Sequence, residues 1–243
     1  SGYSSSVVQS VVRNCTHFSR KKIIQVVYYG IVNRKIVAGI LGVMAIAGTF
    51  TAAQIFNRTS YTVSRVIDGD TFETTEKQRI RIAAVEAPEL ELCGAQQAKQ
   101  TLEKLILGKK IQMKIIFRDP FQRLVSFVYV DKKFVNQEML KSGWTYYKNR
   151  TGQKIPELEN ISDALRKNKK GIFGEKCTQS TNKINPTCTI KGNILLSTGE
   201  KTYHYLGCGQ YGNTQVQLYL GDRWFCTAEE ADENGFKKGK DCL

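Results

Sequence analysis

Two acidic motifs, each at the end of an apolar stretch, constrain the fold of this chain more than any other feature. The sequence D-G-D at 68–70 closes an apolar stretch at 63–67, and E-A-P-E at 86–89 closes a second stretch at 79–85 that carries Arg81. Both stretches have the β-branched and alternating character of strands. If the two strands pair as a hairpin, up to four carboxylates and an arginine converge at one end of a sheet.

The residue types in these motifs favour a cation site. Residues two apart in a strand point the same way, so Asp68 and Asp70 aim their carboxylates to one side of a glycine turn. Pro88 stops the ladder of the second strand. Carboxylate oxygens gathered in this way are hard ligands that suit Ca²⁺.

A third motif makes the pattern specific. The sequence R-D-P-F-Q-R at 118–123 lies between two further strand-like stretches. With it, the chain resembles the staphylococcal nuclease (thermonuclease) family through V-I-D-G-D-T, R-I-R-I-A-A-V-E-A-P-E, D-P-F-Q-R and V-N-Q-E-M-L-K-S-G, in the family's order. The resemblance covers roughly Tyr61 to Cys177 and implies an OB-fold barrel.

The resemblance implies a metal centre and a group that acts on water. By it, Asp70 and Glu86 bind Ca²⁺ directly, the backbone carbonyl of Ala87 adds an oxygen, and Asp68 orders metal-bound water. Glu89 matches the residue that positions or deprotonates the attacking water. The family has Asp at the position of Glu86 and Thr at that of Ala87, so the longer Glu86 shifts the metal slightly, while a backbone ligand survives the change to alanine.

It also implies a set of substrate contacts. Arg81 and Arg123 match two arginines that hold the scissile phosphate, where guanidinium groups suit the charge that develops as water attacks. Phe121 falls where the family often carries an aromatic residue beside the nucleotide, so it is expected either to stack on a base or to plug the base of the loop. Tyr146 and Tyr147 are expected to line the same pocket.

The function implied is a Ca²⁺-dependent endonuclease that hydrolyses DNA, with RNA as an open alternative, to 5′-hydroxyl and 3′-phosphate products. We expect a monomer. One alternative is a non-catalytic OB-fold module that binds nucleic acid, but such a copy would be expected to have lost Arg81, Glu89 or Arg123. Another is a surface anchor in which the C-terminal residues are the functional part.

Periodicity divides residues 59–177 into five strands and about three helices, as the barrel requires. We expect strands at 62–68, 71–76, 78–85, 110–117 and 124–130, and helices at 94–107, 135–142 and 155–168. Asn136 is expected to cap the second helix.

The N-terminal part has a different composition. Residues 1–35 form a basic tail, and 36–56 is a charge-free stretch of 21 residues, long enough to cross a bilayer. A transmembrane helix and a cleaved signal peptide are both consistent with it, and either one puts the rest of the chain outside the cytoplasm. Residues 1–31 are either a cytoplasmic tail or an upstream translation artefact.

Residues 1–67 hold +8 of the net charge of +14, so the remaining +6 is a weak argument for nucleic-acid binding.

Residues 178–187 are polar and predict a linker, and 188–243 predict a small separate module that resembles the "sunset" domain of exported nucleases. It is also similar to the zinc module of methylated-DNA repair proteins, which uses C-x3-C and C-x2-C ligands. Here His204 stands in the first pair and Gly239 in the second, so one ligand is missing. The module is therefore expected to be held by disulfides or by zinc, with His204 as a packed or hydrogen-bonded residue rather than a ligand.

Six of the seven cysteines follow the apolar stretch, which suggests disulfides in an exported region. In the barrel arrangement that the resemblance implies, the chain returns to pack beside the first helix, so we expect a Cys93–Cys177 bridge. The preferred pairs in the last module are Cys188–Cys226 and Cys208–Cys242.

Overall fold

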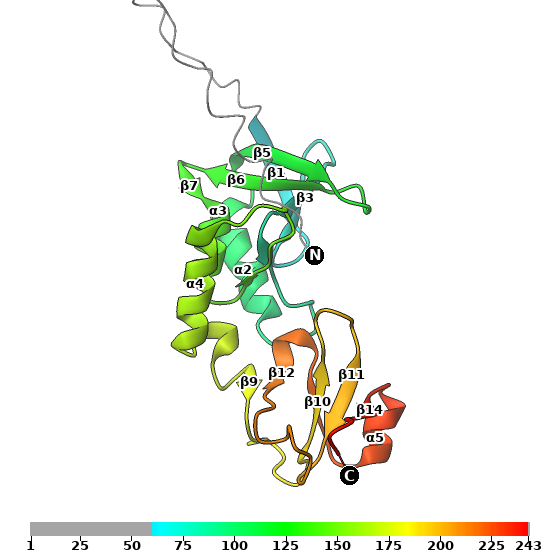
Figure 1. Ribbon diagram of the computed structural model, residues 1–243. Helices are drawn as coiled ribbons and strands as arrows, with labels where there is room; N and C mark the ends of the chain where they lie inside the picture. The colour runs from blue at the N-terminus through cyan, green and yellow to red at the C-terminus, as the bar shows by residue number, and fades with distance from the viewer. Residues whose placement is uncertain (1–59, 243) are drawn as a thin grey trace, which may run out of the picture. The chain divides into compact units, whose positions relative to one another are not determined.

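The computed structural model describes residues 60–242, which begin with a closed barrel (Figure 1). Five strands form it in the order β3-β2-β1-β5-β6, and parallel pairing of β3 with β6 closes the circle. The strands are β1 (Ser60–Val66), β2 (Thr71–Thr74), β3 (Arg79–Ile82), β5 (Lys110–Arg118) and β6 (Leu124–Val130), and the short β7 (Lys133–Phe134) pairs with β6. The predicted five-stranded barrel is confirmed.

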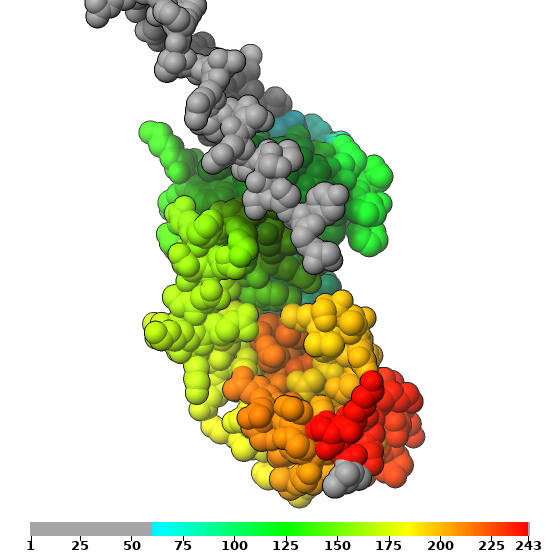
Figure 2. Space-filling view, in the orientation of Figure 1, coloured from blue at the N-terminus to red at the C-terminus, as the bar shows by residue number. Residues whose placement is uncertain are grey.

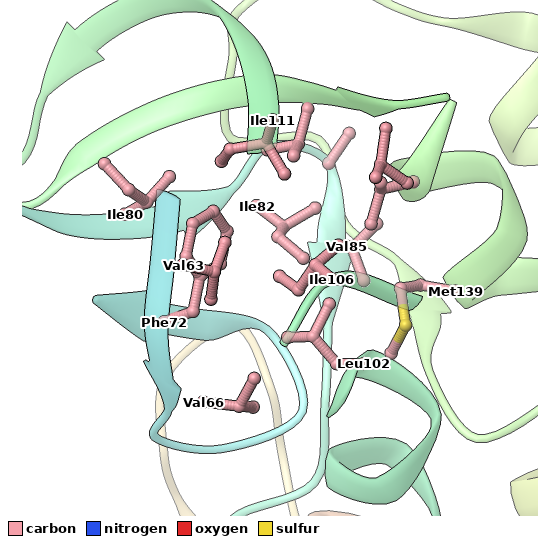
Figure 3. Packing of buried hydrophobic residues seen from close by; sticks show 14 of the residues in the cluster. Val63, Val66, Phe72, Ile80, Ile82, Val85, Leu102, Ile106, Ile111 and Met139 are labelled. Atoms are coloured by element: carbon pink, nitrogen blue, oxygen red, sulfur yellow. The ribbon is translucent and has the colours of Figure 1, made fainter. Parts of the chain in front are cut away.

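Three helices accompany the barrel, as expected. They are α2 (Ala95–Ile106), α3 (Val135–Lys141) and α4 (Pro156–Lys167), and α3 packs against α4. Helix α4 begins with a proline at its first turn, where no backbone donor is lost. Leu102 and Ile106 of α2 lie among the side chains of Phe72 and Ile82 in the barrel core (Figure 3). Burying this apolar face holds α2 on the barrel.

The strand pairing near the acidic motifs differs from the expectation. The strands that precede the motifs do not form a hairpin, because β2 lies between β1 and β3. The stretch 79–85 is also not one strand. Ala84 has a positive φ of 58°, which breaks the ladder after β3, and the chain resumes as β4 (Val85–Glu86), which pairs with β8 (Tyr146–Tyr147). The second acidic motif thus follows a separate short strand and not the barrel strand β3.

Asn136 does not cap α3. Phe134 is the N-terminal flanking residue, and no side chain caps the helix. The Asn136 side chain is buried instead, where its Oδ1 accepts from the Val128 N–H at 2.9 Å and its Nδ2 donates to the Ala83 carbonyl at 2.7 Å. The expected cap is therefore wrong, because the barrel offers two buried backbone partners that need an amide.

The residues after the barrel build a second, smaller sheet. Its strands run β13-β10-β11-β14, and the helix α5 (Ala228–Glu233) accompanies them. The strands are β10 (Ile190–Ile194), β11 (Lys201–His204), β13 (Arg223–Phe225) and β14 (Lys237–Lys238). Figure 2 shows the surface of this part of the chain, coloured from yellow to red. The segment expected to be a linker begins with β9 (Thr178–Gln179), which pairs with β12 (Val216–Gln217).

A small apolar cluster joins the barrel side to the C-terminal residues. Tyr219, in the short helix η3 (Leu218–Leu220), is buried against Tyr146 and Phe173, with ring centroids 5.7 and 5.8 Å apart. Phe173 belongs to the short helix η2 (Gly171–Phe173), and Cys177 completes the cluster. The end of the barrel domain and the module thus share buried surface.

All three predicted disulfides are present: Cys93–Cys177, Cys188–Cys226 and Cys208–Cys242. His204 Nδ1 lies 3.1 Å from the carboxylate of Asp241, so the histidine is paired as expected. Within the described residues, His204, Cys208 and Cys242 place ligand-type atoms within 4.8 Å of one another. Because the two sulfurs are bonded to each other, they do not serve as thiolate ligands in this state.

The predicted tail at 1–35 and apolar segment at 36–56 lie outside the described residues. From 60 to 242, none of the helices combines the length and the hydropathy that a membrane crossing requires.

Candidate active site

The turn between β1 and β2 is built by its own aspartate. Asp68 Oδ1 accepts from the backbone N–H groups of Asp70 and Thr71 at 2.9 and 2.7 Å. A Cβ atom at Gly69 would lie 2.5 Å from the Cβ atoms of Ala87 and of Ala98 on α2. Only glycine therefore lets this turn approach both the second acidic motif and the helix.

Asp70 is the most buried acid of the site. Its Oδ2 accepts from the Ala87 N–H at 2.7 Å, and its Oδ1 accepts from the Thr71 hydroxyl and from Arg81. Burial raises the pKa of Asp70 to about 7, with a further rise from the negative charges of Asp68 and Glu86, while Arg81 and the Ala87 N–H offset part of the rise. The carboxylate thus sits where additional positive charge would be favourable.

Arg81 links the two acidic motifs. Its Nη1 pairs with Asp70, and its Nη2 lies 3.0 Å from Glu86 Oε2. The arginine reaches both because β3 follows β2 in the barrel, and the Ile82 N–H donates to the Asp70 carbonyl at 2.8 Å. The convergence predicted from the sequence is present for these two carboxylates, with a guanidinium between them.

Arg150 is a residue that the sequence reading missed. Its Nε and Nη2 lie 3.0 and 2.9 Å from the two oxygens of Glu86. Glu86 on β4 is the strand partner of Tyr146 on β8, so the chain that follows β8 passes beside Glu86. The one usable signal was a basic residue shortly after the Tyr-Tyr pair, and nothing local pointed to a partner 64 positions away.

Glu89 differs from the other acids of the site. It is exposed, and among the described residues its carboxylate makes no ion pair. Its backbone carbonyl accepts from the Leu92 N–H, which shapes the turn before α2. A carboxylate without a fixed partner remains available to a water molecule.

Arg123 lies in the turn between β5 and β6 and is held by Asp119. Its Nε lies 2.8 Å from Asp119 Oδ2, and its guanidinium lies 5.3 Å from the centroid of the Phe121 ring. Arg123 comes directly before β6, whose first residues Leu124 and Val125 pair with Ile80 and Arg81 of β3. Phe121 is 77% exposed, so its ring faces solvent.

The two predicted pocket tyrosines are packed. Tyr146 is buried, and burial, followed by the charge of Glu86, raises its pKa well above the ordinary value. The hydroxyl of Tyr147 accepts from the Ile155 N–H at 3.1 Å. Tyr146 thus adjoins the acidic site, whereas Tyr147 supports the start of α4.

The donor set fits a hard divalent cation. Asp70 and Glu86 offer carboxylate oxygens on either side of one guanidinium, which are ligands that a hard cation prefers. Within residues 60–242 these acids do not form a cluster of three ligand atoms, so water molecules would have to complete the coordination. This is the usual arrangement for cations that keep part of their hydration shell.

Part of this chain is similar to known proteins. The sequence pattern of the family described as "Staphylococcal nuclease homologue" matches residues 79–175. An "Uncharacterized endonuclease" of Escherichia coli O157:H7 is 31% identical over 119 residues, which are 46% of this chain and 76% of that protein. An "Uncharacterized endonuclease" of Haemophilus influenzae is 31% identical over 121 residues, 47% of this chain and 66% of that protein.

The match to a plant relative covers a smaller share of that protein. The "Probable staphylococcal-like nuclease CAN1" of Oryza sativa subsp. japonica is 31% identical over 98 residues, and the chain spans only 29% of its length. The match to the Escherichia coli endonuclease covers most of that protein, and the family pattern begins at Arg79, after the first acidic motif. The chain belongs to the family of staphylococcal nuclease homologues.

Proposed function

We propose that this protein is a Ca²⁺-dependent nuclease that hydrolyses phosphodiester bonds of DNA, and of RNA as a second substrate. The observation that carries the proposal is the guanidinium of Arg81 held between Asp70 and Glu86, with the exposed acid Glu89 three positions further along the chain. The relatives named as nucleases and endonucleases support the same reaction class.

The residues that would hold the cation are Asp70 and Glu86 through their carboxylates and Ala87 through its carbonyl. Asp68 would order a water molecule of the cation from its position in the turn. When bound, Ca²⁺ would supply positive charge to the phosphate oxygens.

Glu89 acts on the attacking water. Its carboxylate takes a proton as the water oxygen bonds to phosphorus, and the bond from phosphorus to the 5′ oxygen breaks. The leaving oxygen gains a proton from solvent, which gives 5′-hydroxyl and 3′-phosphate products. The exposure of Glu89 supports this role, since a water molecule can reach it.

Arg81 and Arg123 bind the phosphate as its charge grows. Guanidinium groups donate two parallel hydrogen bonds to phosphate oxygens, and an enclosed site strengthens them. The exposed ring of Phe121, beside the guanidinium of Arg123, is placed to stack on a base. Tyr146, the strand partner of Glu86, lines the same substrate pocket.

We further propose that the protein acts outside the cytoplasm, either secreted or anchored through residues 36–56, and as a monomer. The three disulfides support export, because such bonds persist in oxidising compartments.

The test is a plasmid-digestion assay of the purified full chain with Ca²⁺ and with chelator, alongside Asp70→Ala. Loss of a direct ligand is expected to slow cleavage on the order of 10³-fold or more. Cleavage that survives chelator undiminished contradicts the calcium assignment. Binding of DNA without any cleavage would instead favour the non-catalytic module.

To test the surface-anchor alternative, residues 178–243 are deleted, and activity and surface retention are compared.

A further inference from the structure

Arg150 forms a two-pronged ion pair with Glu86. The guanidinium forms two hydrogen bonds, with Nε 3.0 Å from Oε2 and Nη2 2.9 Å from Oε1, and Arg81 adds a third contact at Oε2. Both oxygens of Glu86 are therefore engaged by arginines. A cation that binds Glu86 requires lone pairs on the same two oxygens.

The two arginines differ in how firmly they are placed. Arg81 lies within β3, its side chain is 12% exposed, and Asp70 holds its other nitrogen. The side chain of Arg150 is 51% exposed and, among the described residues, Glu86 is its only ion-pair partner. Arg150 follows β8 in the surface segment 148–154, where Asn149 and Thr151 form a local hydrogen-bonded turn. Its backbone is thus anchored near Glu86, while its head group can move.

We propose that Arg150 is a third phosphate-binding guanidinium of this site, held by Glu86 in the absence of metal and transferred to the nucleic-acid backbone when Glu86 binds a divalent cation. The inference rests on the proposed function, since it takes Glu86 as a metal ligand. Cation and guanidinium compete for the same oxygens, so binding of one weakens binding of the other. The displaced guanidinium keeps its fork of donors, and a phosphate diester is the anionic partner that matches it.

A purely structural role for Arg150 makes a different prediction. If the pair only fastens the segment 148–154 to β4, removal of Arg150 loosens the surroundings of Glu86, and cation binding weakens or stays unchanged. If Arg150 competes with the cation, its removal tightens cation binding and weakens nucleic-acid binding. The two readouts then move in opposite directions.

The experiment uses the full chain with Glu89→Gln, so that cleavage is slowed, and compares Arg150→Gln, Arg150→Lys and Arg65→Gln in that background. Arg65 on β1 is a matched control, because its exposed guanidinium also pairs with a glutamate. Its Nη2 lies 3.4 Å from Oε2 of Glu73. Calorimetry measures Ca²⁺ affinity without nucleic acid, and fluorescence anisotropy measures binding of a labelled single-stranded DNA in saturating Ca²⁺.

For Arg150→Gln we expect Ca²⁺ to bind about 3- to 10-fold more tightly and DNA about 3- to 10-fold more weakly, the net range of one hydrogen bond at a partly exposed site. Arg150→Lys should fall between, since it keeps the charge and loses the fork, and Arg65→Gln should change neither affinity. Unchanged or weaker Ca²⁺ binding in Arg150→Gln, with normal binding in the parent, overturns this inference and leaves the proposed function standing. A parent that binds no Ca²⁺ and whose Glu89-containing form cleaves no DNA overturns both.

Discussion

The side-chain amide of Asn136 on α3 donates to the backbone carbonyl of Ala83, at 2.7 Å. Ala83 precedes the residue with positive φ at which the chain leaves the barrel toward Glu86. The same side chain accepts from the Val128 N–H on β6, so one buried amide fixes the exit of β3 relative to the neighbouring strand. The position of the second acidic motif depends on this contact.

Replacing Asn136 with Ala should therefore lower the free energy of unfolding by about 2–4 kcal/mol, because two buried backbone groups lose their partners. Urea denaturation measures the change. The control is Asn149→Ala, whose side chain bonds only within an exposed turn and whose effect should be small. A loss below about 1 kcal/mol for Asn136→Ala would mean that water replaces the amide.

The raised pKa of Asp70 predicts a pH dependence of stability in chelator. The folded pKa of about 7 exceeds the ordinary value of 3.8, so folding favours the protonated form. This contribution is fully present below about pH 4 and is lost as pH rises through about 7. Asp70→Asn keeps the group neutral, so the variant should gain stability relative to the parent over that interval.

Urea denaturation at several pH values between 4 and 8 tests this expectation. Asp163→Asn, on the exposed face of α4, is the control and should follow the parent. Parallel pH profiles for the parent and Asp70→Asn would show that Arg81 compensates the burial of the carboxylate completely.

Arg81 and Arg123 are expected to act on the transition state more than on substrate binding. Arg81→Lys and Arg123→Lys each keep a positive charge and lose the two-pronged donor geometry. Steady-state kinetics should show a large fall in kcat, about 10²-fold or more, with a modest change in KM. A rise in KM alone would assign these arginines to holding the substrate.

Much of the barrel was predictable from the sequence, because its signals are local. The alternation in β5 and β6 and the helical period of α2 marked elements whose observed bounds lie close to those expected. The approach of Asp70 and Glu86 was also predicted, although the pairing behind that prediction was wrong: β2 intervenes between β1 and β3, and Arg81 of β3 joins the two acids.

Contacts between distant segments were not predictable in this way. Asn136 has the sequence context of a helix cap. The Ala83 carbonyl, to which its side chain donates, comes close to it through the closure of the barrel. Arg150 is one of several basic residues in a polar segment, and its pairing with Glu86 depends on the β4–β8 ladder. Nor did any local pattern show that Ala84 would take a positive φ.

Removal of the Cys93–Cys177 bridge is expected to destabilise the fold and leave the chemistry intact. The cysteines are 84 positions apart, and the chain-entropy estimate for such a loop is roughly 4 to 5 kcal/mol. Cys93→Ser with Cys177→Ser should lower the melting temperature while cleavage at low temperature continues, since the candidate catalytic groups are carboxylates and guanidiniums. Loss of cleavage in a variant that remains folded would tie the bridge to the site.

The same bridge determines what a protease would leave behind. Cys93 and Cys177 enclose β5, β6, α3, α4 and the segment that carries Arg150. A single cut anywhere between them therefore yields two polypeptides that remain one covalent molecule until a reductant is added. With the Cys188–Cys226 and Cys208–Cys242 bridges, the same holds for cuts at 189–225 and 209–241. A cut at 178–187, which none of these bridges spans, would instead leave the barrel and the second sheet on separate covalent molecules.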